Sequence, residues 1–259
     1  MLDNSNGFDN EYAFVKYFNG KRISSLDLSG QELLFNLYPS AHPDSIIKCW
    51  RNHFPQKSDI FIKVENGMKG ISIKKGSRNS VHVDTITNFV NFLLQNDVPK
   101  DIIDAYLQYH YADGTINGSG KRRLSVEEYK QKHQQSIDNI NSFFNEEKFV
   151  KRAIEKFVTR GNNSEYQIDA LICGEPNSFL WLTRKQIYEI LSSKKNIDST
   201  AVHFGKLIVQ PKTRCLNYNP KYEKDRFCVQ IKWYSLFDDI IEYLYNADNC
   251  GSDHPQNAK

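Results

Sequence analysis

The sequence predicts a mixed α/β (α+β) fold. Residues 59–74 alternate apolar and polar side chains around an Asn-Gly pair, which is the pattern of a β-hairpin. Several other segments repeat apolar residues at helical spacing. Two more strand-like segments, 204–212 and 225–234, lie near the C-terminus. A first half of helix, hairpin and helix, and a second half of helices followed by strands, indicate this class.

The first half of the chain carries five predicted helices, of which the first repeats apolar residues at helical spacing and the fourth is amphipathic. Proline is tolerated in the first turn of a helix, so Pro43 and Pro99 favour helix starts. The first helix, capped by Asp9 or Asn10, places Glu11 near its N-terminal end. These helices span residues 8–18, 31–38, 43–53, 83–96 and 99–111.

The hairpin lies between the third and fourth of these helices. Its first strand alternates apolar residues from Ile60 to Val64, and the Asn66-Gly67 pair predicts the turn. The returning strand is followed by a polar loop over residues 76–80.

A glycine-rich, basic loop over residues 112–125 opens the second half. It is the predicted boundary between a region 1–115 and a region 116–259. The Ser-Val-Glu-Glu stretch at Ser125 resembles a capping box. The elements predicted after the loop are a helix over 125–158, a strand over 166–174, a helix over 182–195, strands over 204–212 and 225–234, and a disordered tail after Asn246.

Composition narrows the class of protein. The 259 residues are 39% hydrophobic and 25% charged, which suits a globular protein with a real core. No apolar run is long enough for a membrane span, and the polar, acidic start is not a secretory signal, so we expect a cytoplasmic protein. The five cysteines form no C-x-x-C pair, so we expect free thiols.

Charge is concentrated in one segment. Between Lys206 and Lys232 the chain has seven Lys or Arg residues against two acidic ones, although the net charge is only +3. Such a segment indicates either a surface for a polyanion or an ordinary solvated, lysine-rich face.

The hairpin carries the residues that indicate chemistry. Ser72 and Lys74 are two residues apart in one strand and share a face, and the turn returns that strand beside Asp59. A carboxylate can hold a hard divalent cation that activates water, and a lysine can orient that water and offset developing charge. The same residues also fit an ordinary hairpin with a capping aspartate and solvent-facing lysines.

The stretch "KSDIFIKVENGMKGISIKKGSRNSV" resembles the catalytic hairpin of the PD-(D/E)XK nuclease superfamily, particularly of small restriction endonucleases. The metal-binding Asp of the family maps onto Asp59 and its Lys onto Lys74. Ser58 stands where a Pro is frequent. Ser72 stands where most members carry Glu or Asp, and where some monomeric enzymes of the MspI kind carry Asn or Gln.

Further patches resemble the same group in the same order. The stretch "GFDNEYAFVKYF" is similar to its N-terminal helix, so Glu11 maps onto a Glu that faces the active site. Glu11 is then a metal partner, through water or for a second ion, or else a surface or capping residue. The segments around Arg160-Gly161 and "FGKLIVQPK", "VQIKWY" and "LFDDI" resemble a GCGC-cutting relative.

The resemblance implies a restriction-endonuclease-like core, a mixed β-sheet flanked by helices, with residues 1–115 as catalytic core and 116–259 as a strand-containing DNA-recognition region. It implies Mg²⁺ as cofactor, held by Asp59 with Ser72 and the carbonyl of Ile73 as further ligands. Catalysis then rests on Asp59, Ser72, Lys74 and Glu11. Predicted DNA contacts are Lys75, Arg78, Asn79, His82, Lys121, Arg122, Arg123, Gln210, Lys212, Arg214, Arg226, Gln230 and Lys232.

Each group of predicted DNA contacts has an ordinary alternative. His82 fits a capping or core histidine, the basic triple at 121–123 fits solvated loop charge, and the later strands fit a half-exposed sheet.

The predicted function is a type II restriction endonuclease that cuts double-stranded DNA at a short palindrome, which the resemblance suggests is GC-rich and GCGC-like. The resemblance implies a monomer, and a cognate DNA methyltransferase as partner in the system rather than as a bound subunit. The rivals are a nicking or repair nuclease of the same superfamily and an inactive DNA-binding module.

Overall fold

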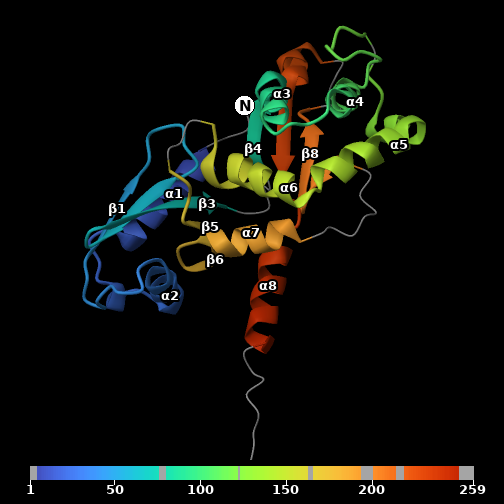
Figure 1. The fold of residues 1–259 in the computed structure, drawn as a ribbon. Helices are drawn as coiled ribbons and strands as arrows, with labels where there is room; N and C mark the ends of the chain where they lie inside the picture. Colours follow the sequence, from blue (N-terminus) through green and yellow to red (C-terminus); the bar gives the residue numbers. More distant parts are fainter. Residues whose placement is uncertain are drawn as a thin grey trace, which may run out of the picture. The chain divides into compact units, whose positions relative to one another are not determined.

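The computed structural model describes residues 5–75, 80–121, 123–162, 166–193, 201–213 and 219–250. Contacts group the chain into two units, drawn in Figure 1. The grouping differs from the predicted division at residue 115, because strand pairing joins segments that are distant in the sequence. The first unit comprises Met1–Arg78, Thr159–Ile190 and Ser235–Lys259, and the second comprises Asn79–Val158 and Leu191–Tyr234.

The first unit is built on a five-stranded mixed sheet with the order β1-β2-β3-β5-β6. Strands β1, β2 and β3 are antiparallel neighbours, β3 runs parallel to β5, and β6 returns antiparallel to β5. The strands are β1 (Ile47–Arg51), β2 (Ile60–Val64), β3 (Gly67–Lys74), β5 (Ala170–Glu175) and β6 (Ser178–Thr183).

One face of this sheet forms the apolar core beneath two helices. Helix α1 (Ser5–Phe18) lies across β1, β2, β3 and β5, and α2 (Leu28–Leu37) contacts β6. Phe14 and Phe18 are fully buried against strand residues such as Ile60. Helix α7 (Arg184–Ser192) follows β6, and α8 (Leu236–Cys250) also contacts β6 (Figure 1). Ile71 and Ile73 of β3 belong to this core, so Ser72 between them lies on the opposite face of the hairpin.

The second unit is built on a four-stranded antiparallel sheet with the order β4-β9-β8-β7. Buried and half-buried residues alternate along β8 and β9, so one face is core and the other is polar. The elements are β4 (Ser80–Thr85), α3 (Ile86–Gln95), α4 (Lys100–Tyr111), α5 (Val126–Phe144), α6 (Glu147–Ile154), a π-helix (Glu155–Arg160), β7 (His203–Phe204), β8 (Leu207–Pro211), a 3₁₀ helix (Pro220–Phe227) and β9 (Cys228–Lys232).

Aromatic rings fill the core of the second unit. The ring centroid of Phe92 lies 4.7 Å from that of Phe157, and Phe89 lies 4.9 Å from Tyr106. Phe204 of β7 joins the same cluster through Phe157. These residues come from two α-helices, a π-helix and a strand, so the cluster ties the unit together.

Most predicted elements are confirmed, including the first helix, the hairpin and the capping box of Ser125 with Glu128. The helix predicted over 43–53 is wrong, because alternate residues of this segment are buried in strand β1 against β2. The helix predicted over 125–158 breaks at Asn145, the C-cap of α5. Strands β4 and β6 and helix α8 were not predicted.

Two further expectations can be compared with the fold. Among the described residues, no helix has the length and apolar character needed to cross a membrane. Cys49 and Cys173 are buried free thiols and Cys228 is a partly buried one, whereas Cys215 lies outside the described residues.

Candidate active site

The β2–β3 hairpin places Asp59 beside Ser72. The register pairs Ile60 with Ile71, so the next pair outward is Asp59 and Ser72. The Ser72 hydroxyl donates to Oδ2 of Asp59 at 3.0 Å, and the Ile73 N–H donates to the same oxygen at 2.6 Å. The backbone of Asp59 is held as well, since its N–H donates to the Ile71 carbonyl at 2.8 Å. The carboxylate is therefore fixed in direction.

Lys74 lies at the end of β3, two residues beyond Ser72 and on the same face. It is half-buried, and the parallel register sets it beside Cys173 of β5. Burial raises the pKa of the Cys173 thiol to about 12, and the neighbouring Lys74 charge only partly opposes this. The thiol stays protonated at neutral pH and is no candidate nucleophile.

Helix α1 brings Glu11 to the same end of the sheet. Neighbouring Asn10 is buried and donates from its side-chain amide to the Gly174 carbonyl at 2.9 Å, which ties α1 to the end of β5. Burial, and then the nearby Asp59 carboxylate, raise the pKa of Glu11, whereas Arg51 and Lys74 lower it. The charges of Asp59 and Lys74 therefore both act on Glu11.

The donor set fits one hard cation with a mostly aqueous shell. Within the described residues, three or more His, Cys, Asp or Glu side chains converge nowhere as a metal cage would require. Mg²⁺ needs only one or two carboxylates and keeps several waters. The N–H and C=O of one strand residue point to the same side, so the Ile73 carbonyl faces the side on which Asp59 lies. Asp59 and Ile73 are thus the candidate ligands.

Ser72 serves Asp59 more directly than it would serve a cation. The residue is only 5% exposed, and its hydroxyl proton is committed to the Asp59 carboxylate. A charge-assisted hydrogen bond of this kind orients the acceptor as well as stabilising it. The geometry supports Ser72 as the residue that aims Asp59.

The predicted phosphate contacts of the first unit are only partly described. Lys75 is exposed and pairs with Glu175 of β5 at 2.9 Å. This surface pair can exchange for a phosphate at little cost. Four predicted contacts lie outside the described residues: Arg78, Asn79, Arg122 and Arg214.

The predicted DNA contacts His82 and Arg123 have internal partners in the second unit. His82 lies 3.3 Å from Asp84 and 5.3 Å, between ring centroids, from Phe157. Arg123 is 5% exposed and donates to the carbonyls of Tyr111 and His110 at 2.7 and 2.6 Å, which closes the end of α4.

Arg226 anchors the glycine-rich loop. It donates to the Asp113 carboxylate and, at 2.5 Å, to the Gly120 carbonyl. These bonds make Arg226 part of the loop's framework. Lys121, in contrast, is exposed in the same loop.

The polar face of the second sheet presents the remaining predicted residues. Gln230 of β9 donates to the Ser80 hydroxyl at 3.1 Å, and Gln210 of β8 donates to Gln230 at 3.2 Å. The Tyr234 hydroxyl donates to Gln210 at 3.1 Å, and Lys232 lies 5.1 Å from the Tyr234 ring. Lys212 instead pairs with Asp225 at 2.9 Å, at the margin of this face.

No protein-family model matches the chain, and no curated protein matches it in sequence. A solved structure of the restriction endonuclease MspI in complex with its cognate DNA is similar to it, with a TM-score of 0.55 and 11% sequence identity. The match covers 90% of this chain and 93% of the MspI chain. The chain has a restriction-endonuclease-like fold. The fold class predicted from the sequence is therefore confirmed.

Sequence reasoning missed three residues, one beside the candidate active site and two on the polar face of the second sheet. Arg51 at the end of β1 pairs with Glu11, and it was hidden because its segment was predicted to be helical. The alternation of Ile47, Cys49 and Arg51 was the available signal. Ser80, which pairs with Lys232 across the sheet, and Tyr234, which follows β9, join the polar face of the second sheet by hydrogen bonds, and neither gave a local signal.

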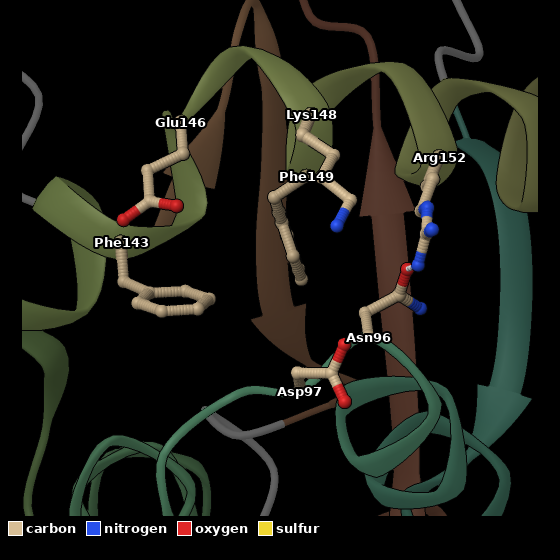
Figure 2. A pocket seen from close by; sticks show the side chains of 7 residues that line it. All are labelled: Asn96, Asp97, Phe143, Glu146, Lys148, Phe149 and Arg152. Atoms are coloured by element: carbon tan, nitrogen blue, oxygen red, sulfur yellow. Dashed lines mark hydrogen bonds between the residues drawn. The ribbon is translucent and has the colours of Figure 1, made fainter.

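A cavity of about 250 Å³ opens in the second unit between α6 and the end of α3. Figure 2 shows the Arg152 side chain reaching Asn96, to which it donates at 2.9 Å. Two acidic and two basic side chains line the cavity, so it has no net charge to attract a polyanion or a metal ion. We assign it no part in catalysis. It is lined by Asn96, Asp97, Phe143, Glu146, Lys148, Phe149 and Arg152.

Proposed function

We propose that this protein is a Mg²⁺-dependent type II restriction endonuclease that hydrolyses phosphodiester bonds of double-stranded DNA. One observation carries the proposal: the Asp59 carboxylate is aimed by Ser72 and Ile73, with Lys74 on the same strand, within a restriction-endonuclease-like fold. A fold alone does not define an activity, whereas these side chains supply the groups that the proposed hydrolysis needs.

Each residue has a separate role in the proposed reaction. Asp59 and the Ile73 carbonyl would hold Mg²⁺, which when bound polarises the phosphate and lowers the pKa of a bound water. The Ser72 hydroxyl orients the Asp59 carboxylate by its hydrogen bond. Lys74 orients the attacking water and offsets charge that develops on the phosphate. Glu11 contributes a second carboxylate at the edge of the site. The products of the proposed reaction carry 5′-phosphate and 3′-hydroxyl ends.

The polar face of the second sheet is the proposed base-reading surface. Gln and Lys side chains on a strand can reach base edges in the major groove. Gln210, Gln230 and Lys232 lie on this face of the sheet. Lys75, Lys121 and Lys212 are proposed phosphate contacts. We leave Arg123, Arg226 and His82 out of this surface, because their side chains are engaged inside the second unit.

The finer features of the proposal follow the family resemblance. The site would be a short, GC-rich palindrome of the GCGC kind, cut by a monomer. A DNA methyltransferase of matching specificity would protect the host DNA.

The decisive experiment is incubation with unmodified phage DNA and Mg²⁺, beside an EDTA control. Discrete fragments are expected from the wild type, and their sequenced ends would give the recognition site. We expect Lys74→Ala to lose about 100-fold or more in rate. Lys48→Ala is the matched control, because Lys48 is an exposed strand lysine of the same unit, and it should cleave like the wild type.

Other outcomes would favour the rival functions. Nicked plasmid or a smear that still depends on Asp59 and Mg²⁺ would indicate a nicking or repair nuclease. Tight DNA binding without cleavage would indicate an inactive DNA-binding module, which the neutral Ser72 in place of a second carboxylate specifically favours.

A further inference from the structure

Arg51 is enclosed by one face of helix α1. Its Nε donates to Oε2 of Glu11 at 2.6 Å, and Nη1 donates to the Tyr12 hydroxyl at 3.4 Å. The guanidinium also lies over two rings, 4.3 Å from the centroid of Phe8 and 5.2 Å from that of Tyr12. Helical spacing brings these side chains to one side of α1, and Arg51 reaches them from the end of β1.

This arrangement differs from an ordinary surface ion pair. The Arg51 and Glu11 side chains are only 19% and 16% exposed, whereas those of the Arg22–Asp44 pair in the same unit are 58% and 59% exposed. A guanidinium that is stacked and hydrogen-bonded keeps its place better than a freely hydrated cation. Arg51 is therefore a fixed positive charge at the edge of the candidate active site.

Glu11 has a reason to need such a charge. Helix α1 places it at the same end of the sheet as Asp59, and two carboxylates in one partly buried site repel each other. A cation beside Glu11 relieves this repulsion. Arg51 and a divalent cation can relieve it in the same way, so the two compete for the same carboxylate.

We infer that Arg51 is an internal counter-ion that occupies the place a second divalent cation would take at Glu11, so that the site binds a single cation on Asp59. This inference rests on the proposed function for the identity of the Asp59 site. Glu11 would then contribute its negative charge to the site without holding a cation of its own, and Arg51 is a positioning residue.

The test is Mn²⁺ binding to the free protein, followed by electron paramagnetic resonance without DNA. We expect one Mn²⁺ on the wild type. Arg51→Met should gain a second Mn²⁺ or bind the first about tenfold more tightly, since a positive charge is removed and Glu11 is released. Arg51→Lys keeps the charge and should resemble the wild type. Arg22→Met breaks an exposed ion pair of the same unit and is the control for the loss of an arginine as such.

The double variant makes the test specific to Glu11. Arg51→Met combined with Glu11→Gln removes one charge of each sign, so Mn²⁺ binding should return to one ion at the wild-type affinity. A purely structural clamp between α1 and β1 can only lower Mn²⁺ binding when it is broken. An increase that is reversed by Glu11→Gln therefore separates the two roles.

Several results would overturn the inference. They are unchanged or weaker Mn²⁺ binding by Arg51→Met, an increase that persists in the double variant, two ions on the wild type, or no saturable binding at all. Failure of the proposed function is a separate result, because a wild type that binds one Mn²⁺ but cleaves no DNA would leave the Arg51 assignment standing.

Discussion

Replacing Asp59 by Asn and by Ala should separate its role in the fold from its role in catalysis. Asp59 Oδ2 accepts hydrogen bonds from the Ser72 hydroxyl and the Ile73 N–H, and Ile73 is only 8% exposed. Ala removes the acceptor and leaves a largely buried N–H without one, at a cost of about 1–3 kcal/mol in the free energy of unfolding. Asn keeps an oxygen in place, and it also removes the negative charge that raises the pKa of Glu11.

We therefore expect the free energy of unfolding of Asp59→Asn to lie within about 1 kcal/mol of the wild-type value. Asp59→Ala should be less stable than Asp59→Asn. Both should lose cleavage, because a neutral side chain holds Mg²⁺ poorly. A loss of about 4 kcal/mol in transition-state stabilisation corresponds to about a 1,000-fold slower reaction.

Urea unfolding gives the stabilities, and conversion of supercoiled plasmid in Mg²⁺ gives the rates. Cleavage by Asp59→Asn within tenfold of the wild type would refute Asp59 as the metal-holding residue. Equal destabilisation by Asn and Ala would instead refute the account of the two hydrogen bonds.

Three further changes test other parts of the structure. Gln230→Ala should keep the free energy of unfolding but cost about 1–3 kcal/mol of discrimination between the recognition site and sites with one altered base pair, measured by competitive cleavage. Hydrogen bonds from Thr115 and Arg226 outweigh burial and lower the pKa of Asp113. The stability that Asp113 contributes is therefore fully present above its unfolded pKa of about 3.9 and lost as the pH falls through the lower folded value, so urea unfolding of Asp113→Asn should show a deficit at pH 7 that shrinks below about pH 4. Gly205→Ala should lower the melting temperature far more than Gly114→Ala, because both have positive φ but only at Gly205 would Cβ meet a backbone carbonyl oxygen, at 1.9 Å.

The catalytic hairpin was readable from the sequence, but its register was not. The Asn66-Gly67 pair predicted the turn, whereas the observed two-residue loop is Glu65-Asn66, with Val64 opposite Gly67. With the predicted turn, Asp59 would lie opposite Lys74. The observed register sets it opposite Ser72, because a change in loop position shifts every cross-strand pair.

The sequence also did not predict which basic side chains are available to bind DNA. Arg123 in the basic loop 112–125 and Arg226 in the basic segment 206–232 were both predicted DNA contacts, yet both donate to backbone carbonyls within the second unit. Lys121, in the same loop, is exposed. Sequence gives the charge of a side chain, but burial and partners come from segments distant in the chain.

The sequence by itself determined the mixed fold class, most of the helices, and the shared face of Ser72 and Lys74. These features depend on the local periods of helix and strand, which neighbouring residues define. The tertiary structure alone decided that Asp59 meets Ser72 and that Arg51 meets Glu11. Such partners depend on strand register and on the packing of α1 against the sheet, and local periodicity carries no information about either.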